Sequence, residues 1–143
     1  MSRNTTRVPA RIFMGLLLVV HAGLALWGVL GVLDRLGVTL VPLQNALFSV
    51  TVQWAHWAAI LTGGFVFLTG YLTRWRWTPL AMTGAYLFMG GMCVIETFGF
   101  LTHSTRFIDM MLEFVTYFVI LTFLFRSGLA RERFGRTLAN SST

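Results

Sequence analysis

Apolar residues gather in four blocks along this chain, separated by short segments that contain most of the charged and turn-forming residues. The blocks cover residues 12–33, 48–72, 80–101 and 107–125. Each is about as long as the roughly 20 residues that an α-helix needs to cross the hydrocarbon core of a bilayer. The pattern therefore predicts an all-α, polytopic membrane protein in which four transmembrane helices form a single bundle.

Turn and interface signals support these boundaries. Asp34 and Arg35 close the first block, and the basic aromatic run 74–77 closes the second. Tryptophan is enriched where helices leave the membrane. Pro79 fits the first turn of a third helix, because the amide hydrogen that proline lacks would have no partner there. The tail, residues 126–143, is basic and then rich in serine and threonine, and we expect it to fray.

The composition excludes an ordinary water-soluble domain. Apolar residues make up 56% of the 143 residues and charged residues 11%, whereas soluble domains usually carry about 25% charged residues. The mean hydropathy is +0.73. The basic residues are all arginines that flank the apolar blocks instead of forming one basic face, so no nucleic-acid partner is expected. Exclusive use of arginine favours a bacterial source, and hence the bacterial cytoplasmic (inner) membrane.

The distribution of arginine predicts the topology. Nine of the eleven arginines lie in the N-terminal segment, in the loop between the second and third blocks, and in the C-terminal tail. By the positive-inside rule both termini are cytoplasmic, which agrees with an even number of spans. An alternative is that residues 1–25 form a cleaved signal peptide. The apolar run continues beyond any such cleavage point, which favours a retained helix.

Small residues form stripes along the first three predicted helices. In lipid the hydrophobic effect does not drive helices together, so association depends on close backbone approach and on interhelical hydrogen bonds. We expect the stripes to pack the bundle tightly, although one of them could instead face a partner protein. The stripes consist of Ala25, Gly28 and Gly31, then Ala59, Gly63 and Gly70, then Gly84, Gly90, Gly91 and Gly99.

Four ionisable side chains lie within the predicted spans: His21, His56, Glu96 and Glu113. Charged groups at bilayer depth are costly, so each is a candidate functional residue. A rise of about 1.5 Å per residue places His56, Glu96 and Glu113 at one depth, roughly 6–9 Å to the external side of the span centres. His21 falls near the midplane. If the helix faces point inward, His56 and the two glutamates meet in the external half of the bundle.

Neighbouring polar side chains extend this cluster. Tyr117 shares a face of the fourth helix with Glu113, and His103 and Asp109 lie closer to the external interface, where they would form a polar entrance. A carboxyl group removed from water prefers its neutral form, and a nearby histidine can share its proton. The cluster could therefore load protons or hold a quinol or a cation. In the structural alternative, its members hydrogen-bond across helices and fix the register of the bundle.

Cofactor binding has weaker support. His56, Glu96 and Glu113 offer nitrogen and oxygen ligands for a metal ion, but the paired Glu-x-x-His spacing of di-iron bundles is absent from the sequence. A haem would use His21 and His56, and their offset of roughly 6 Å in depth opposes ligation by both. Cys93 is the single cysteine, so no disulfide can form within the chain. We expect it to be a small buried apolar residue.

Two functions remain open at this stage. The sequence contains none of the nucleophile-elbow, zinc-protease, P-loop or paired-cysteine motifs, so no independent catalytic activity is expected. The first hypothesis is an accessory or structural subunit that packs against a larger membrane complex or against copies of itself. The second is a redox or transport component in which His56, Glu96 and Glu113 handle a metal, a quinone or protons.

Overall fold

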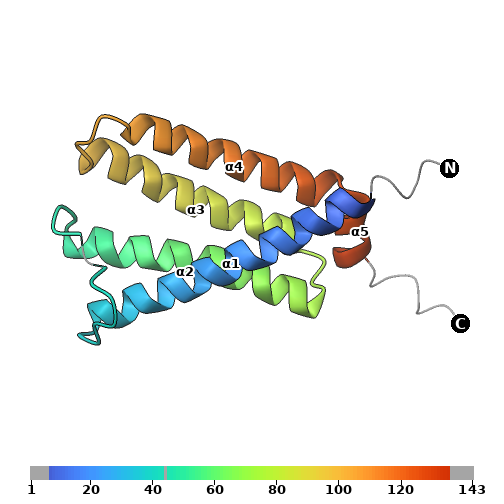
Figure 1. Ribbon diagram of the computed structural model, residues 1–143, viewed down its shortest axis with the longest axis horizontal. Coiled ribbons are helices and arrows are strands. Elements are labelled where there is room, and N and C mark those ends of the chain that lie inside the picture. The colour runs from blue at the N-terminus through green and yellow to red at the C-terminus, as the bar shows by residue number, and fades with distance from the viewer. Residues whose placement is uncertain (1–6, 44, 136–143) are drawn as a thin grey trace, which may run out of the picture.

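The computed structural model describes residues 7–43 and 45–135, and this part of the chain is built from helices. It contains α1 (Arg7–Arg35), α2 (Val50–Thr73), α3 (Thr78–Gly99), α4 (Arg106–Arg126) and α5 (Gly128–Phe134) (Figure 1). The first four are long and apolar enough to cross a membrane. The expected helical fold with four candidate spans is therefore confirmed, and it suggests a multi-pass membrane protein.

The ends of the long helices follow local signals. The Ser49 hydroxyl accepts a hydrogen bond from an amide in the first turn of α2, at 3.3 Å. Arg74 ends α2 in the left-handed conformation, with φ 55°. Pro79 occupies the first turn of α3, as predicted. The helix α1 begins earlier than predicted, at Arg7, because Pro9 falls in its first turn, where a proline breaks no helical hydrogen bond.

The C-terminal segment departs from the sequence expectation. Residues 128–134 form the short helix α5, whose first turn is capped by the Ser127 hydroxyl, 3.0 Å from the amide of Ala130. Ala130 and Phe134 are buried in the core. The expectation of a frayed tail is wrong for this segment, because two apolar side chains one helical turn apart give it a buried face. Residues 136–143 of the expected tail lie outside the described part.

A close helix crossing joins α1 and α2. A Cβ atom added to Gly64 would lie 2.6 Å from the backbone nitrogen of Ala25 on α1, so only glycine fits at this point. Gly28 and Gly31 likewise face side chains of α2. The small-residue stripe predicted on the first helix therefore packs as expected, and at Gly64 of α2 it is the backbone of α1 that lies against the glycine.

The stripe predicted on the second helix also packs as expected, with Ala59 buried, whereas the stripe on the third helix is only partly used. Gly63 and Gly90 each contact a side chain of the next helix, and Gly70 contacts the beginning of α3. Three glycines of the third helix have no neighbour within 4 Å of an added Cβ, so they do not contribute to the packing of this chain. These are Gly84, Gly91 and Gly99.

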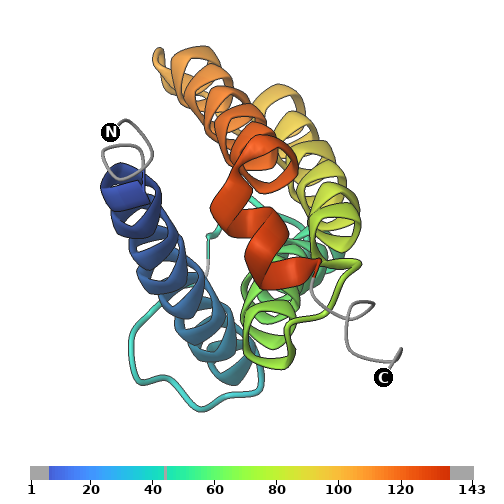
Figure 2. The same ribbon diagram turned by 90° about the vertical axis from the view of Figure 1, so that its right-hand side faces the viewer.

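The long helices pack in chain order, and the bundle is unequal at its two ends. We call the end where α1 begins and α4 ends the base, and the opposite end, with segments 36–49 and 100–105, the loop end. At the base, Phe13 of α1 meets Phe123 of α4 with ring centroids 4.7 Å apart. From there α1 and α4 diverge toward the loop end (Figure 1). The helix α5 lies across the base, in contact with α1, α2 and α4 (Figure 2).

Candidate functional site

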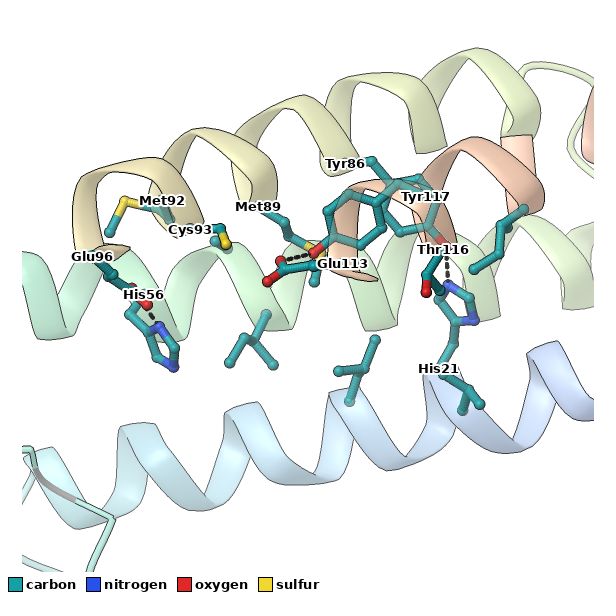
Figure 3. A pocket seen from close by; sticks show the side chains of 15 residues that line it. His21, His56, Tyr86, Met89, Met92, Cys93, Glu96, Glu113, Thr116 and Tyr117 are labelled. Atoms are coloured by element: carbon teal, nitrogen blue, oxygen red, sulfur yellow. Dashed lines mark hydrogen bonds and ion pairs between the residues drawn. The ribbon is translucent and has the colours of Figure 1, made fainter. Parts of the chain in front are cut away.

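A cavity of about 350 Å³ lies between the four long helices, and we call it the central cavity (Figure 3). Each long helix contributes to its wall. Most of the lining is apolar, but it also contains four of the six residues predicted for the cluster and its entrance, together with His21. The polar and sulfur-containing lining residues are His21, His56, Tyr86, Met89, Met92, Cys93, Glu96, Glu113, Thr116 and Tyr117.

Two of the predicted residues form a direct pair. Nδ1 of His56 on α2 lies 2.6 Å from Oε1 of Glu96 on α3. The side chains are 28% and 12% exposed respectively, so the pair is largely removed from solvent. Nε2 of His56 forms no hydrogen bond with any residue in the described part of the chain. The ring can therefore hold Glu96 with one nitrogen and offer the other to a ligand.

Glu113 lines the same cavity but has a different partner. The hydroxyl of Tyr117, one turn later on α4, donates a hydrogen bond to its Oε1 atom. In Figure 3, Glu113 lies further along the bundle than the pair of His56 and Glu96, with Cys93 between the two carboxyl groups. The three predicted residues therefore face one cavity, but they are spread along it and do not meet at a single depth.

A second buried pair continues the polar line toward the base. His21 is fully buried, with Nδ1 2.7 Å from the carbonyl oxygen of Leu17 and Nε2 2.8 Å from the hydroxyl of Tyr86. A carbonyl oxygen can only accept, so Nδ1 carries a proton, and a neutral ring then accepts the Tyr86 hydroxyl at Nε2. The rings of Tyr86 and Tyr117 stack at 4.4 Å, with their hydroxyls pointing in opposite directions (Figure 3).

Tyr86 was not among the residues predicted from the sequence. It lies in the middle of α3 on the face that also carries Met82 and Met89, all three of which are buried. Tyrosine is usually found at the ends of membrane spans, where it faces the interface. A tyrosine near the middle of a predicted span is therefore unusual, and this position could have identified Tyr86 as a candidate. Cys93 is half-buried rather than fully buried, and it faces the central cavity.

His103 and Asp109, predicted to form an entrance, form an exposed pair at the loop end. Nε2 of His103 lies 3.1 Å from Oδ2 of Asp109, and neither residue lines the central cavity. A second cavity of about 290 Å³, which we call the loop-side cavity, lies at the loop end but is not lined by His103 or Asp109. It shares His56 and Glu96 with the central cavity and also contains Asn45 and Gln53.

Gln53 holds the wall of the loop-side cavity in place. Its amide nitrogen donates to the carbonyl oxygens of Asn45, at 2.7 Å, and Phe48, at 3.2 Å, and its amide oxygen accepts from Arg35 at 2.8 Å. These bonds tie α2 to α1 and to the segment between them. The sequence analysis overlooked Gln53, although an amide in the first turn of an apolar helix is a plausible loop anchor.

The residues predicted as ligands of a metal ion or a haem lie apart or already have partners. Within residues 7–43 and 45–135, no group of three or more His, Cys, Asp or Glu side chains lies close enough together to hold a metal ion. His21 and His56 both line the central cavity, but both ring nitrogens of His21 already form hydrogen bonds within the protein. A haem would therefore have to displace the Tyr86 hydroxyl to reach His21.

Comparison with known protein families, with curated proteins and with solved structures finds no match in any of the three. The geometry of the two cavities is therefore the basis for assigning a function.

Proposed function

We propose that this protein binds a lipid-soluble quinone in the central cavity, where His56 and Glu113 hydrogen-bond to the ligand and exchange protons with it. One observation carries the proposal: a mainly apolar cavity of about 350 Å³ contains two separate pairs of hydrogen-bonded ionisable side chains, His56 with Glu96 and Glu113 with Tyr117. Apolar pockets of about 300–1,000 Å³ with a few convergent polar groups are the usual form of small-molecule sites.

The position of the cavity favours a ligand that arrives from the lipid. Val20 of α1 and Thr116 of α4 both line the cavity and are exposed, and these two helices diverge toward the loop end. A molecule dissolved among the acyl chains would reach the cavity through this gap without crossing the bundle. A quinone head group would then lie inside, while its apolar tail extended back through the gap into the membrane.

The polar groups match the chemistry of a quinone. Each quinone oxygen accepts a hydrogen bond, which Nε2 of His56 donates when it carries a proton and the Glu113 carboxyl donates when it is neutral. Reduction to the quinol adds two electrons to the ring and one proton to each oxygen. Nε2 of His56 has no partner in the described part of the chain, and the Glu113 carboxyl faces the cavity (Figure 3). These two groups lie apart along the cavity, as the two ends of one ring would require. The stacked rings of Tyr86 and Tyr117 supply a flat aromatic wall.

The loop-side cavity supports a route for protons. His56 and Glu96 line both cavities, so a proton taken from the ligand by the imidazole would pass to a space that reaches the loop end. The hydrogen bond between Nδ1 and Oε1 allows the proton to reside on either group. A partner protein in the membrane would supply or take the electrons. The proposal therefore includes the role within a larger membrane complex that the sequence led us to expect.

A purely structural role, the first hypothesis from the sequence, is supported by two hydrogen bonds between helices, His56 with Glu96 and His21 with Tyr86, but these bonds do not account for the cavity. Hydrogen bonds that only fix the register of a bundle need no space between the helices. The central cavity separates the pair of His56 and Glu96 from the pair of Glu113 and Tyr117 instead of joining them (Figure 3). The observed arrangement therefore supports ligand binding over a purely structural cluster.

We also propose that the base faces the cytoplasm of a bacterium, with the protein in the inner membrane. Seven arginines of the described part of the chain lie at the base, whereas Arg35 and Arg106 lie at the loop end. The positive-inside rule then assigns the base to the cytoplasmic side and the loop-side cavity to the external side. The seven arginines at the base are Arg7, Arg11, Arg74, Arg76, Arg126, Arg131 and Arg133.

The experiment that tests ligand binding is a titration of the purified full chain with a short-chain benzoquinone. Thermal unfolding in detergent gives the affinity, because a ligand at about 100 times its dissociation constant stabilises by about 2.7 kcal/mol. Thr116→Phe places a large side chain in the cavity mouth, and Val115→Phe adds the same group on an exposed position that does not line the cavity. We expect Thr116→Phe to abolish stabilisation and Val115→Phe to retain it.

An alkylbenzene of the same size serves as the ligand control, since it fits the cavity but cannot accept hydrogen bonds. We expect it to bind roughly thirtyfold more weakly than the quinone, the effect of losing two hydrogen bonds of about 1 kcal/mol each. Equal binding of the two molecules would contradict the assigned roles of His56 and Glu113. Equal stabilisation of Thr116→Phe and wild type by the quinone would place the ligand outside the central cavity and reject the proposal.

A further inference from the structure

A third cavity lies at the base and has a different character from the other two. It measures about 320 Å³ and is formed by α1, α2 and α5; we call it the basic cavity. Two arginines line it, Arg11 and Arg133, and its described lining contains no acidic side chain. The remaining lining residues are Met14, Gly15, Leu18, Tyr71 and Leu129.

Arg133 is held firmly in the wall of this cavity. One of its terminal nitrogens donates to the carbonyl oxygen of Tyr71 at 2.9 Å, and the guanidinium group stacks over the ring of the same residue at 4.1 Å. Its Nε atom is buried and forms no hydrogen bond within the described part of the chain. A guanidinium group fixed in this way loses little freedom when it binds an anion.

Arg11 supplies a second positive charge from α1. Its side chain is exposed, and it forms no ion pair with a described residue. Two positive charges that line one small cavity repel each other unless an anion lies between them. The surroundings increase this effect, because arginine is the prevailing charged residue at the base.

We propose that the basic cavity binds the phosphate group of an anionic membrane phospholipid. Arginine recognises phosphate oxygens with paired, charge-assisted hydrogen bonds, and basic pockets between transmembrane helices at the cytoplasmic side are suited to anionic lipid head groups. Met14 and Leu18 form an apolar wall next to the arginines, which suits a lipid that carries an acyl chain below its phosphate. A free phosphate ion would gain nothing from this wall.

Thermal unfolding of the full chain in detergent, with added phosphatidylglycerol, phosphatidylcholine or sodium phosphate, tests the proposal. We expect phosphatidylglycerol to give a saturable rise in Tm, and the other two to give none at equal phosphate concentration. Phosphatidylcholine has the same phosphate group but no net charge, so it measures general effects of lipid. A rise with sodium phosphate equal to that with phosphatidylglycerol would assign the site to a free anion and overturn the lipid source.

Two matched pairs of variants locate the effect. Arg11→Gln removes a charge of the basic cavity, whereas Arg126→Gln removes one at the base that does not line it. Gly15→Phe fills the cavity, and Gly23→Phe makes the same change two turns further along α1; an added Cβ has no neighbour within 4 Å at either position. These variants are therefore expected to fold, whereas replacement of Arg133 would also break its bond to Tyr71.

We expect Arg11→Gln to weaken phosphatidylglycerol binding about tenfold and Gly15→Phe to abolish the rise in Tm, with both controls behaving as wild type. Loss of binding in Arg126→Gln equal to that in Arg11→Gln would show a general attraction of the basic end for anionic lipid and overturn the site. Retained binding in Gly15→Phe would overturn it as well.

Discussion

Gly64 provides a direct test of the crossing between α1 and α2. At this residue an added Cβ would lie 2.6, 2.8 and 2.9 Å from three atoms of Ala25. Favourable contacts between carbon atoms are at about 3.5–4.0 Å, so Gly64→Ala requires the two helices to move apart by about 1 Å. Two of the three opposing atoms belong to the backbone of α1, and the strain cannot be relieved by rotating a side chain.

The expected cost follows from this overlap. Overpacking of a well-packed interior costs about 1–3 kcal/mol, and for a chain of this size 1 kcal/mol corresponds to about 3 °C in Tm. Gly64→Ala is therefore expected to lower Tm by roughly 3–9 °C. Gly84→Ala is the control, because an added Cβ there meets no atom within 4 Å. Alanine favours a helix by about 1 kcal/mol relative to glycine, so this variant should melt at or above the wild-type temperature.

The assay is circular dichroism of the purified variants in one detergent, followed through thermal unfolding. Agreement of far-ultraviolet spectra before heating would show that each variant is helical. Equal Tm values for Gly64→Ala and Gly84→Ala would refute the close crossing, since the two substitutions are chemically identical and differ only in what the new methyl group meets.

Two further predictions concern topology and the site. In a chain whose native cysteine is replaced by Cys93→Ala, Trp75→Cys and Ser104→Cys should react with an impermeant thiol reagent from opposite sides of the membrane; labelling from the same side would rule out four spans. At the site, Glu113→Gln retains an acceptor for the Tyr117 hydroxyl and should shift Tm by less than about 3 °C. Glu113→Leu leaves that hydroxyl without its partner and should cost about 1–3 kcal/mol; equal melting of the two variants would show that the hydrogen bond has no stabilising role.

The sequence allowed the long helices to be predicted, because their apolar length has one main physical explanation. It also located several of the polar residues that line the central cavity, His56, Glu96 and Glu113 among them. His56 and Glu96 were expected to meet, and they lie 2.6 Å apart. The rise of 1.5 Å per residue gives the depth of a residue along its helix. Depth was sufficient to predict this contact because both side chains point into the bundle.

Rotation about the helix axis could not be predicted in the same way. Glu113 faces the cavity, but its carboxyl is held by Tyr117 on its own helix and does not reach His56. On α3, Gly90 faces a neighbouring helix while Gly91 faces open space. Adjacent small residues point about 100° apart, so composition alone cannot say which one packs. The buried partner of His21 was missed for the same reason, since Tyr86 lies 65 residues away in the chain.

The position of α5 has a consequence for the order of assembly. It follows all four long helices in the chain, so it leaves the ribosome after them. Until Ala130 and Phe134 are synthesised, α1 and α4 lack the element that lies across them at the base. Within the described part of the chain this short segment is synthesised last, and a stop codon placed before residue 128 would leave α1, α2 and α4 without the element that contacts all three.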